Sequence, residues 1–199
     1  MLLSAEIRLF WFHQEPQDLE DWFFSAAIHH RNPDGPEQRT DIYLPEPDQT
    51  ELGVKTRGFN PGIELKGLVA RPGETLQFAS HEIPLELWTK WPSAALAFDP
   101  QRGIGIEKKR WSRKFDTSGH EPVDSSDPQR ANGCNVEWTI VRPASGDPCW
   151  TFGFEAFGRL PAVENSLRSV VRLMNNRRPP AAPGAEILSY PAYLARVRT

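Results

Sequence analysis

Apolar and polar residues alternate along most of the chain with the period of two that marks half-buried β-strands. The pattern is clearest at residues 3–12, where Ile7 and Leu9 fall on one face and Arg8 on the other. Similar stretches predict strands at 39–44, 51–58, 63–70, 75–80, 103–115, 135–142 and 150–157. The chain contains 19 prolines, which cluster between these stretches and predict turns around about eight short strands.

Helical periodicity replaces this alternation in two segments. Residues 18–28 and 161–176 repeat apolar residues at intervals of three and four, which predicts one buried face on each helix. A further helical turn or short helix is expected at 84–91. The polar stretch at 116–132 is rich in Ser, Asp and Pro and predicts a mobile loop.

Strands and helices do not alternate along the chain, which disfavours a parallel βαβ sheet. The sequence therefore predicts a mainly β (α+β) fold with antiparallel strands. A length of 199 residues fits one domain. We expect that domain at residues 1–178, followed by a Pro-rich linker and a short docking tail at 179–199.

Long charged side chains recur two residues apart on the predicted strands, so that both members of a pair share one face. Such pairs are Lys55 with Arg57, Glu64 with Lys66, and Lys108 with Arg110. In an ordinary β-sandwich these charges would simply be solvated, and that interpretation stays open. However, the two amphipathic helices need an apolar sheet face to cover. The charged rows would then point into a curved sheet, and about eight antiparallel strands can close into a tunnel-like barrel.

A charged barrel interior is costly unless its charges are paired or hold a ligand of opposite charge. Six inward cations against four acids would suit a polyanion, with a metal ion between phosphate and carboxylate. The predicted fold is therefore an eight-stranded antiparallel barrel with flanking helices and an anion site inside.

The order of short charged patterns along the chain supports the same conclusion. It runs through Glu6-x-Arg8, Asp41-Ile42-Tyr43-Leu44, Lys55-Thr56-Arg57, Glu64-Leu65-Lys66, Lys108-x-Arg110 and Phe154-Glu155-Ala156-Phe157. This order, which spans roughly residues 4–157, resembles that of the CYTH family, the triphosphate tunnel proteins.

The resemblance implies a tunnel that binds triphosphates or related organic phosphates with Mg²⁺ or Mn²⁺, and that acts as a metal-dependent triphosphate hydrolase. It assigns phosphate contacts to Arg8, Lys55, Arg57, Lys66, Lys108 and Arg110. Glu6 and Glu155 would be the catalytic carboxylates and, with Glu137, the metal ligands, while Glu64 is a weaker candidate.

Several positions depart from the family pattern. Ser4 stands where the first acid is expected, and Gly153 and Phe157 flank the single late acid, Glu155. Two-metal phosphoryl chemistry needs several oxygen ligands around each ion. The loss of carboxylates therefore weakens the case for catalysis more than the case for binding. The alternative is a non-catalytic ligand-binding or interaction protein on the same fold.

Net charge and missing motifs argue against several other classes of function. The formal net charge is −3, which argues against a general nucleic-acid binder. No stretch approaches the ~20 apolar residues of a membrane span, and the first residues do not resemble a secretory signal, so we expect a cytoplasmic protein without a membrane partner. P-loop, Rossmann and zincin motifs are absent. Cys134 and Cys149 are expected to be reduced structural thiols, although a disulfide is geometrically possible.

Overall fold

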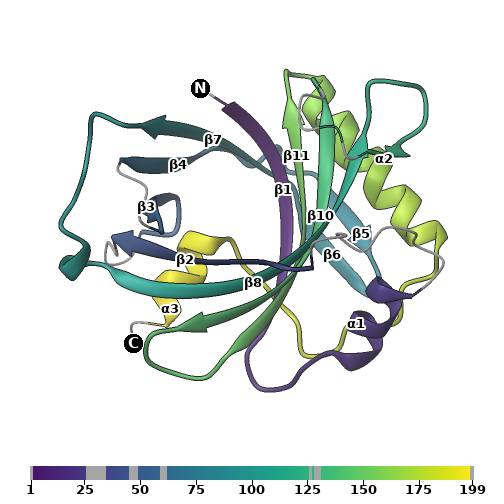
Figure 1. The fold of residues 1–199 in the computed structure, drawn as a ribbon. Coiled ribbons are helices and arrows are strands. Elements are labelled where there is room, and N and C mark those ends of the chain that lie inside the picture. Colours follow the sequence, from purple (N-terminus) through teal and green to yellow (C-terminus); the bar gives the residue numbers. More distant parts are fainter. Residues whose placement is uncertain are drawn as a thin grey trace.

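Eight strands of this computed structural model pair edge to edge until the sheet closes on itself (Figure 1). The structure describes residues 2–25, 35–44, 49–58, 62–125, 127 and 131–197. Around the barrel the strands are β1 (Leu2–Trp11), β7 (Glu86–Ser93), β4 (Ile63–Ala70), β3 (Leu52–Arg57), β2 (Glu37–Leu44), β8 (Ile104–Asp116), β10 (Gly133–Pro143) and β11 (Cys149–Gly158). Every neighbouring pair is antiparallel, which confirms the predicted fold class.

The remaining elements lie around this barrel. They are α1 (Gln17–Phe24), the hairpin of β5 (Thr75–Phe78) and β6 (His81–Pro84), a 3₁₀ turn at Pro100–Arg102, β9 (Val123–Asp124), α2 (Ala162–Asn176), β12 (Glu186–Ile187) and α3 (Tyr190–Arg196). Strand β9 pairs with β8, and β12 pairs with β1. In the part of the chain that the structure describes, none of the helices combines the length and apolar character needed to cross a membrane.

Two predicted elements need correction. The helix expected at 84–91 is wrong, because residues from Glu86 onward form β7, which pairs with both β1 and β4. Aromatic and β-branched residues suit such a strand, and two partner strands override the helix-like clustering of its apolar side chains. The strand expected at 75–80 exists as β5 but lies outside the barrel. The predicted end of the first helix, residues 26–28, lies outside the described residues, as does part of the loop expected at 116–132.

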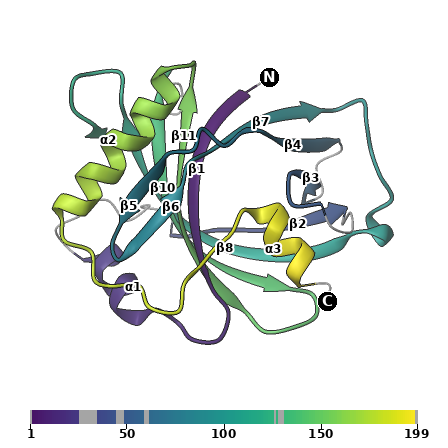
Figure 2. The same cartoon turned by 180° about the vertical axis from the view of Figure 1, so that it is seen from behind.

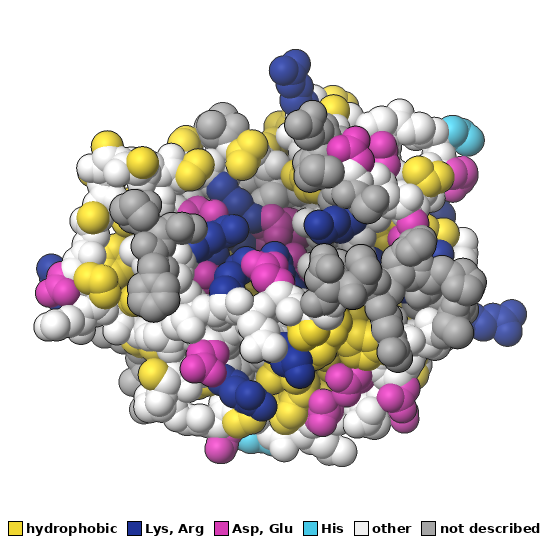
Figure 3. Space-filling model, in the orientation of Figure 1, with side chains coloured by type: hydrophobic (Ala, Val, Ile, Leu, Met, Phe, Trp, Pro, Cys, Tyr) yellow, Lys and Arg dark blue, Asp and Glu magenta, His cyan; other side chains and the backbone are white. Residues whose placement is uncertain are grey.

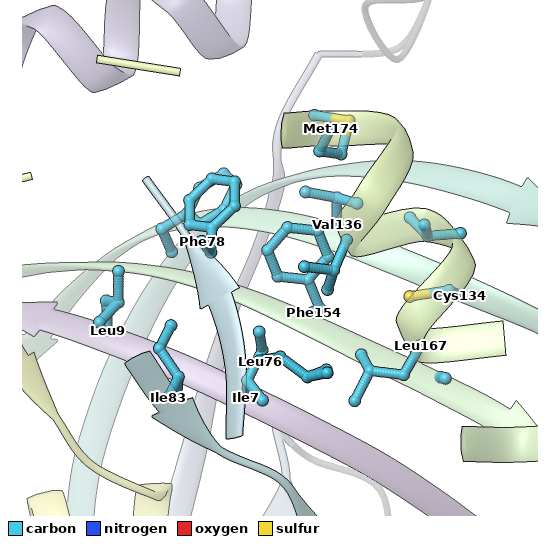
Figure 4. Packing of buried hydrophobic residues seen from close by; sticks show 14 of the residues in the cluster. Ile7, Leu9, Leu76, Phe78, Ile83, Cys134, Val136, Phe154, Leu167 and Met174 are labelled. Atoms are coloured by element: carbon cyan, nitrogen blue, oxygen red, sulfur yellow. The ribbon is translucent and has the colours of Figure 1, made fainter. Parts of the chain in front are cut away.

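The outward face of one side of the barrel forms the main hydrophobic core. Alternation along β1 sends Ile7 and Leu9 outward, where they meet α1, α2 and the β5–β6 hairpin (Figures 1 and 4). Phe78 of the hairpin and Phe154 of β11 make an edge-to-face contact with ring centroids 5.0 Å apart. The helices therefore cover the apolar outside of β1, β10 and β11, which leaves the inward face of these strands for polar residues.

A second, smaller cluster fills the barrel interior at one end. Phe10, Tyr43 and Val141 point inward there and pack against α3, which lies beside β3 (Figure 2). The ring of Tyr193 on α3 stacks on Phe10 with centroids 5.0 Å apart. The rings of Phe10, Tyr43, Tyr190 and Tyr193 thus form an aromatic floor at one end of the barrel, below the rows of charged side chains.

Both cysteines are free and buried, as expected for reduced structural thiols. Cys134 belongs to the outer core and Cys149 to the inner cluster. The two thiols therefore lie on opposite faces of the barrel wall.

Truncation of the outer core should destabilise the fold strongly. Phe154→Ala removes a ring that is 1% exposed, and we expect the free energy of unfolding to fall by about 3–5 kcal/mol. Val69→Ala, at a side chain that is 56% exposed, is the control and should change it by less than about 0.5 kcal/mol. Urea unfolding followed by tryptophan fluorescence measures both, and equal effects of the two substitutions would contradict this packing.

Candidate functional site

The barrel encloses a pocket of about 260 Å³ above its aromatic floor. Figure 3 shows Lys and Arg side chains mixed with acids around a hollow near the centre of the face in view. Every residue predicted to contact phosphate or metal lines this pocket, namely Glu6, Arg8, Lys55, Arg57, Lys66, Lys108, Arg110, Glu137 and Glu155. Glu64 lines it as well. The structure thus brings the whole predicted set together, while the role of each residue stays a prediction.

Space inside the barrel explains one departure from the family pattern. Gly153 pairs with Arg8 across β11 and β1. A Cβ atom at position 153 would lie only 2.7 Å from the Cζ atom of Arg8. Glycine therefore makes room for the Arg8 guanidinium at a position where a carboxylate was expected.

Asp41 of β2 is the centre of the first charge cluster. Its carboxylate is fully buried and lies 3.1 Å from the Nζ atoms of both Lys55 and Lys108, and 3.2 Å from the Nε atom of Arg39. Burial alone would raise the pKa of Asp41, but Lys108, Lys55 and Arg39 outweigh it and hold this pKa well below its usual range. Asp41 therefore stays ionised and joins β2, β3 and β8.

Lys108 occupies the most enclosed position among these cations. Its ammonium donates to the Tyr43 hydroxyl over 2.5 Å and lies 3.9 Å from the centre of the Tyr190 ring. Burial, together with the charge of Lys55, lowers the pKa of Lys108 well below its ordinary value. The aromatic rings of the floor thus reach up to the charged part of the pocket.

Glu137 of β10 is the centre of the second cluster. Arg8 contacts it over 3.0 Å and Arg110 over 2.7 Å. Burial would raise the pKa of Glu137, but the two guanidinium groups lower it below the usual value. Arg110 also binds Glu37 at the edge of the barrel through its Nε atom, over 3.0 Å.

Glu6, Glu155 and Glu64 complete the set of acids in the pocket. Lys66 forms an ion pair with Glu6, and Lys90 forms one with Glu155. Near the pocket mouth, Arg57 binds Glu64 over 2.9 Å. Each of these carboxylates therefore already has a cationic partner.

Cations still outnumber carboxylates in this network. Eight Lys and Arg side chains and four Glu side chains line the pocket among the described residues. Asp41 and Glu37 pair with four of these cations and raise the number of acids to six, which leaves two more cations than carboxylates. An ammonium has three donors and a guanidinium has five, so ion pairs with carboxylates do not use all of them. The pocket can therefore donate to an anion that carries several oxygens.

The carboxylates fit a resident metal ion poorly. Within the described ranges, no three His, Cys, Asp or Glu side chains lie close enough together to hold one ion. Glu6, Glu137 and Glu155 share the pocket, but ammonium or guanidinium groups contact all three. An ion would have to displace these groups.

Sequence patterns missed two charged residues and one aromatic residue of the pocket. Lys90 lies on β7, the strand that was predicted as a helix, and Tyr190 lies on α3. Arg39 stands two residues before Asp41 on the same strand face, so the alternation of β2 contains the signal that finds it.

Comparisons with known proteins do not identify a function for the pocket. No family model matches the sequence, and no curated protein matches it. Among solved structures, a conserved hypothetical protein from Pyrococcus furiosus is 12% identical, with a TM-score of 0.41, and the match covers 91% of this chain and 94% of that chain. The PH1012 protein from Pyrococcus horikoshii OT3 is 12% identical, with a TM-score of 0.39 and the same coverage. Similarity this low carries no information about activity, so the function has to be derived from the pocket.

Replacement of the buried carboxylate tests the first cluster. Asp41→Asn leaves Lys55, Lys108 and Arg39 without their shared counter-charge, and we expect a loss of about 3–5 kcal/mol in the free energy of unfolding. Because the pKa of Asp41 is lower in the native state than in the unfolded state, the unfolded state binds more protons as the pH falls. Stability should therefore drop as the pH falls below about 5 and continue to drop toward the lowered native pKa of Asp41, and by less in Asp41→Asn than in the parent chain.

Urea unfolding at several pH values measures this difference. Glu107→Gln, at an exposed position on β8, is the control and should keep the parent chain's pH dependence. An acid-dependent loss in Asp41→Asn as large as that of the parent would contradict the role of this carboxylate.

Proposed function

We propose that the barrel binds a phosphorylated small molecule of the triphosphate or polyphosphate class. The observation that carries this proposal is the convergence of eight Lys and Arg side chains in one pocket, where counting Asp41 and Glu37 with the four Glu side chains still leaves two more cations than carboxylates. Such a surplus in a partly buried cavity attracts a multiply charged anion.

The distribution of donors around the wall favours phosphate. Arg8 comes from β1, Lys55 from β3 and Arg110 from β8, so cationic donors face the pocket from well-separated strands. A polyphosphate presents charged oxygens on all sides, and guanidinium groups bind such oxygens in pairs. A planar monocarboxylate would leave most of these donors unused.

The size of the pocket favours a compact ligand. Pockets for drug-sized ligands usually measure roughly 300–1,000 Å³. About 260 Å³ lies just below that range and suits a short phosphate chain or the phosphate end of a larger molecule. The resemblance to the triphosphate tunnel proteins supports the same ligand class. A nucleic-acid strand is not the expected partner, because the cations line the inside of the barrel.

Hydrolysis of the bound triphosphate is the second candidate function. The order of the charged motifs favours it, and Glu6 and Glu155 would be its carboxylates, with Mg²⁺ or Mn²⁺ as the metal. The ion pairs of these acids favour binding without catalysis instead.

Calorimetry with inorganic tripolyphosphate tests the binding proposal. Arg110→Ala removes a charge-assisted contact, and we expect the affinity to fall by about tenfold to a hundredfold. Arg57→Ala, at a side chain that is 47% exposed, should weaken binding by less. Arg168→Ala is the matched control, because this arginine also binds two glutamates but lies on α2 outside the barrel. Equal affinities for all three folded variants would contradict a site inside the barrel.

A phosphate-release assay separates binding from hydrolysis. The protein is incubated with inorganic triphosphate, nucleoside triphosphates and thiamine triphosphate, each with Mg²⁺ or Mn²⁺. We expect binding without release of phosphate, because the acids are occupied by cations. Metal-dependent release that is lost in Glu155→Gln would show instead that the pocket is a triphosphatase.

A further inference from the structure

Glu6 and Glu155 lie side by side on the barrel wall. They are directly paired residues of β1 and β11, and both side chains face the pocket. Two neighbouring carboxylates repel each other inside a protein unless a cation shares them. The identity of that cation therefore determines what the pocket can bind.

An ammonium group of the chain itself occupies this position. The Nζ atom of Lys90 forms an ion pair with Glu155 and lies 3.6 Å from the Oε1 atom of Glu6. Among the described residues, Lys90 is the one side chain with ion-pair contacts to both carboxylates. Burial would lower the pKa of Lys90, but Glu155 and Glu6 outweigh burial and raise it above its usual value. The group is therefore charged at neutral pH.

The neighbouring Lys66 does not replace Lys90 in this role. Its ammonium forms an ion pair with Glu6 and lies 4.6 Å from the centre of the Trp88 ring. It thus neutralises one acid of the pair, whereas Lys90 bridges both. Without Lys90, Glu155 would lose the cation that contacts it, and the two adjacent carboxylates would keep only the Lys66 ammonium, which contacts Glu6.

We propose that Lys90 is a built-in counter-ion that takes the place of a divalent cation between Glu6 and Glu155, so that anion binding in this pocket is independent of metal. The part of this proposal that concerns the anion rests on the proposed function, but the occupation of the acid pair does not. Mg²⁺ and Mn²⁺ prefer carboxylate oxygens. Removal of the ammonium therefore converts the acid pair into a site for such an ion.

Manganese binding tests directly whether Lys90 keeps a divalent cation away from Glu6 and Glu155, without any phosphate ligand. The electron paramagnetic resonance signal of free Mn²⁺ is titrated with the full chain and with Lys90→Met, which keeps the length and apolar stem of the side chain. We expect Lys90→Met to bind Mn²⁺ at least about tenfold more tightly than the parent chain. Adding Glu155→Gln to Lys90→Met should abolish this gain.

Lys109→Met is the matched control, because Lys109 is exposed on the outer face of β8. It should bind Mn²⁺ as the parent chain does. The inference is overturned if folded Lys90→Met binds Mn²⁺ no better than Lys109→Met. It is also overturned if the parent chain itself binds Mn²⁺ tightly and loses it in Glu155→Gln.

A second titration separates this inference from the proposed function. Tripolyphosphate is added to the parent chain in the presence of a chelator and, separately, with Mg²⁺, and we expect binding with the chelator present and no gain in affinity with Mg²⁺. Binding that requires Mg²⁺ would overturn the inference while the proposed function stands. Absence of binding in both conditions would overturn the proposed function, whereas a gain of Mn²⁺ binding in Lys90→Met would still support the role of Lys90.

Discussion

An ionised carboxylate that is buried in a protein needs cations or hydrogen-bond donors around it, and the rest of this pocket depends on how the barrel meets that requirement. Asp41 is fully buried and has Lys55, Lys108 and Arg39 around it. The four groups come from β2, β3 and β8, so the charge cluster also fixes three strands of the barrel relative to one another. Removal of Asp41 would leave three cations without their shared counter-charge, which costs several kcal/mol.

The same pairing explains how a barrel can carry cations inside and still fold. Glu137 between Arg8 and Arg110, and Glu155 beside Lys90, repeat the arrangement at β10 and β11. The carboxylates neutralise most of the cations and hold them in place before any ligand arrives. Two cations remain in excess, and that surplus makes the pocket attractive to an anion. Preorganised donors of this kind lower the cost of binding, because few side chains have to be ordered when the ligand enters.

Alternation with a period of two is what made most of the pocket predictable from the sequence. It placed Arg8, Lys55 and Lys108 on inward faces once the amphipathic helices were assigned to the outside. It failed at Lys90, because the clustered tryptophans of that segment look helical until pairing with β1 and β4 is known. Tyr190 reaches the pocket through tertiary packing of α3, which no local pattern encodes. The sequence also cannot show that Gly153 makes room for a guanidinium, since that depends on its register with β1.

A crystal structure with bound tripolyphosphate would show whether the ligand lies inside the barrel. We expect phosphate density above the aromatic floor, with oxygens about 2.7–2.9 Å from the side-chain nitrogens of Arg8, Lys55 and Arg110. We also expect Lys90 to keep its contacts with Glu6 and Glu155 in that structure. The opposite result would be tripolyphosphate bound only on the outer surface, with no anion among the interior ion pairs. That result would contradict binding inside the barrel.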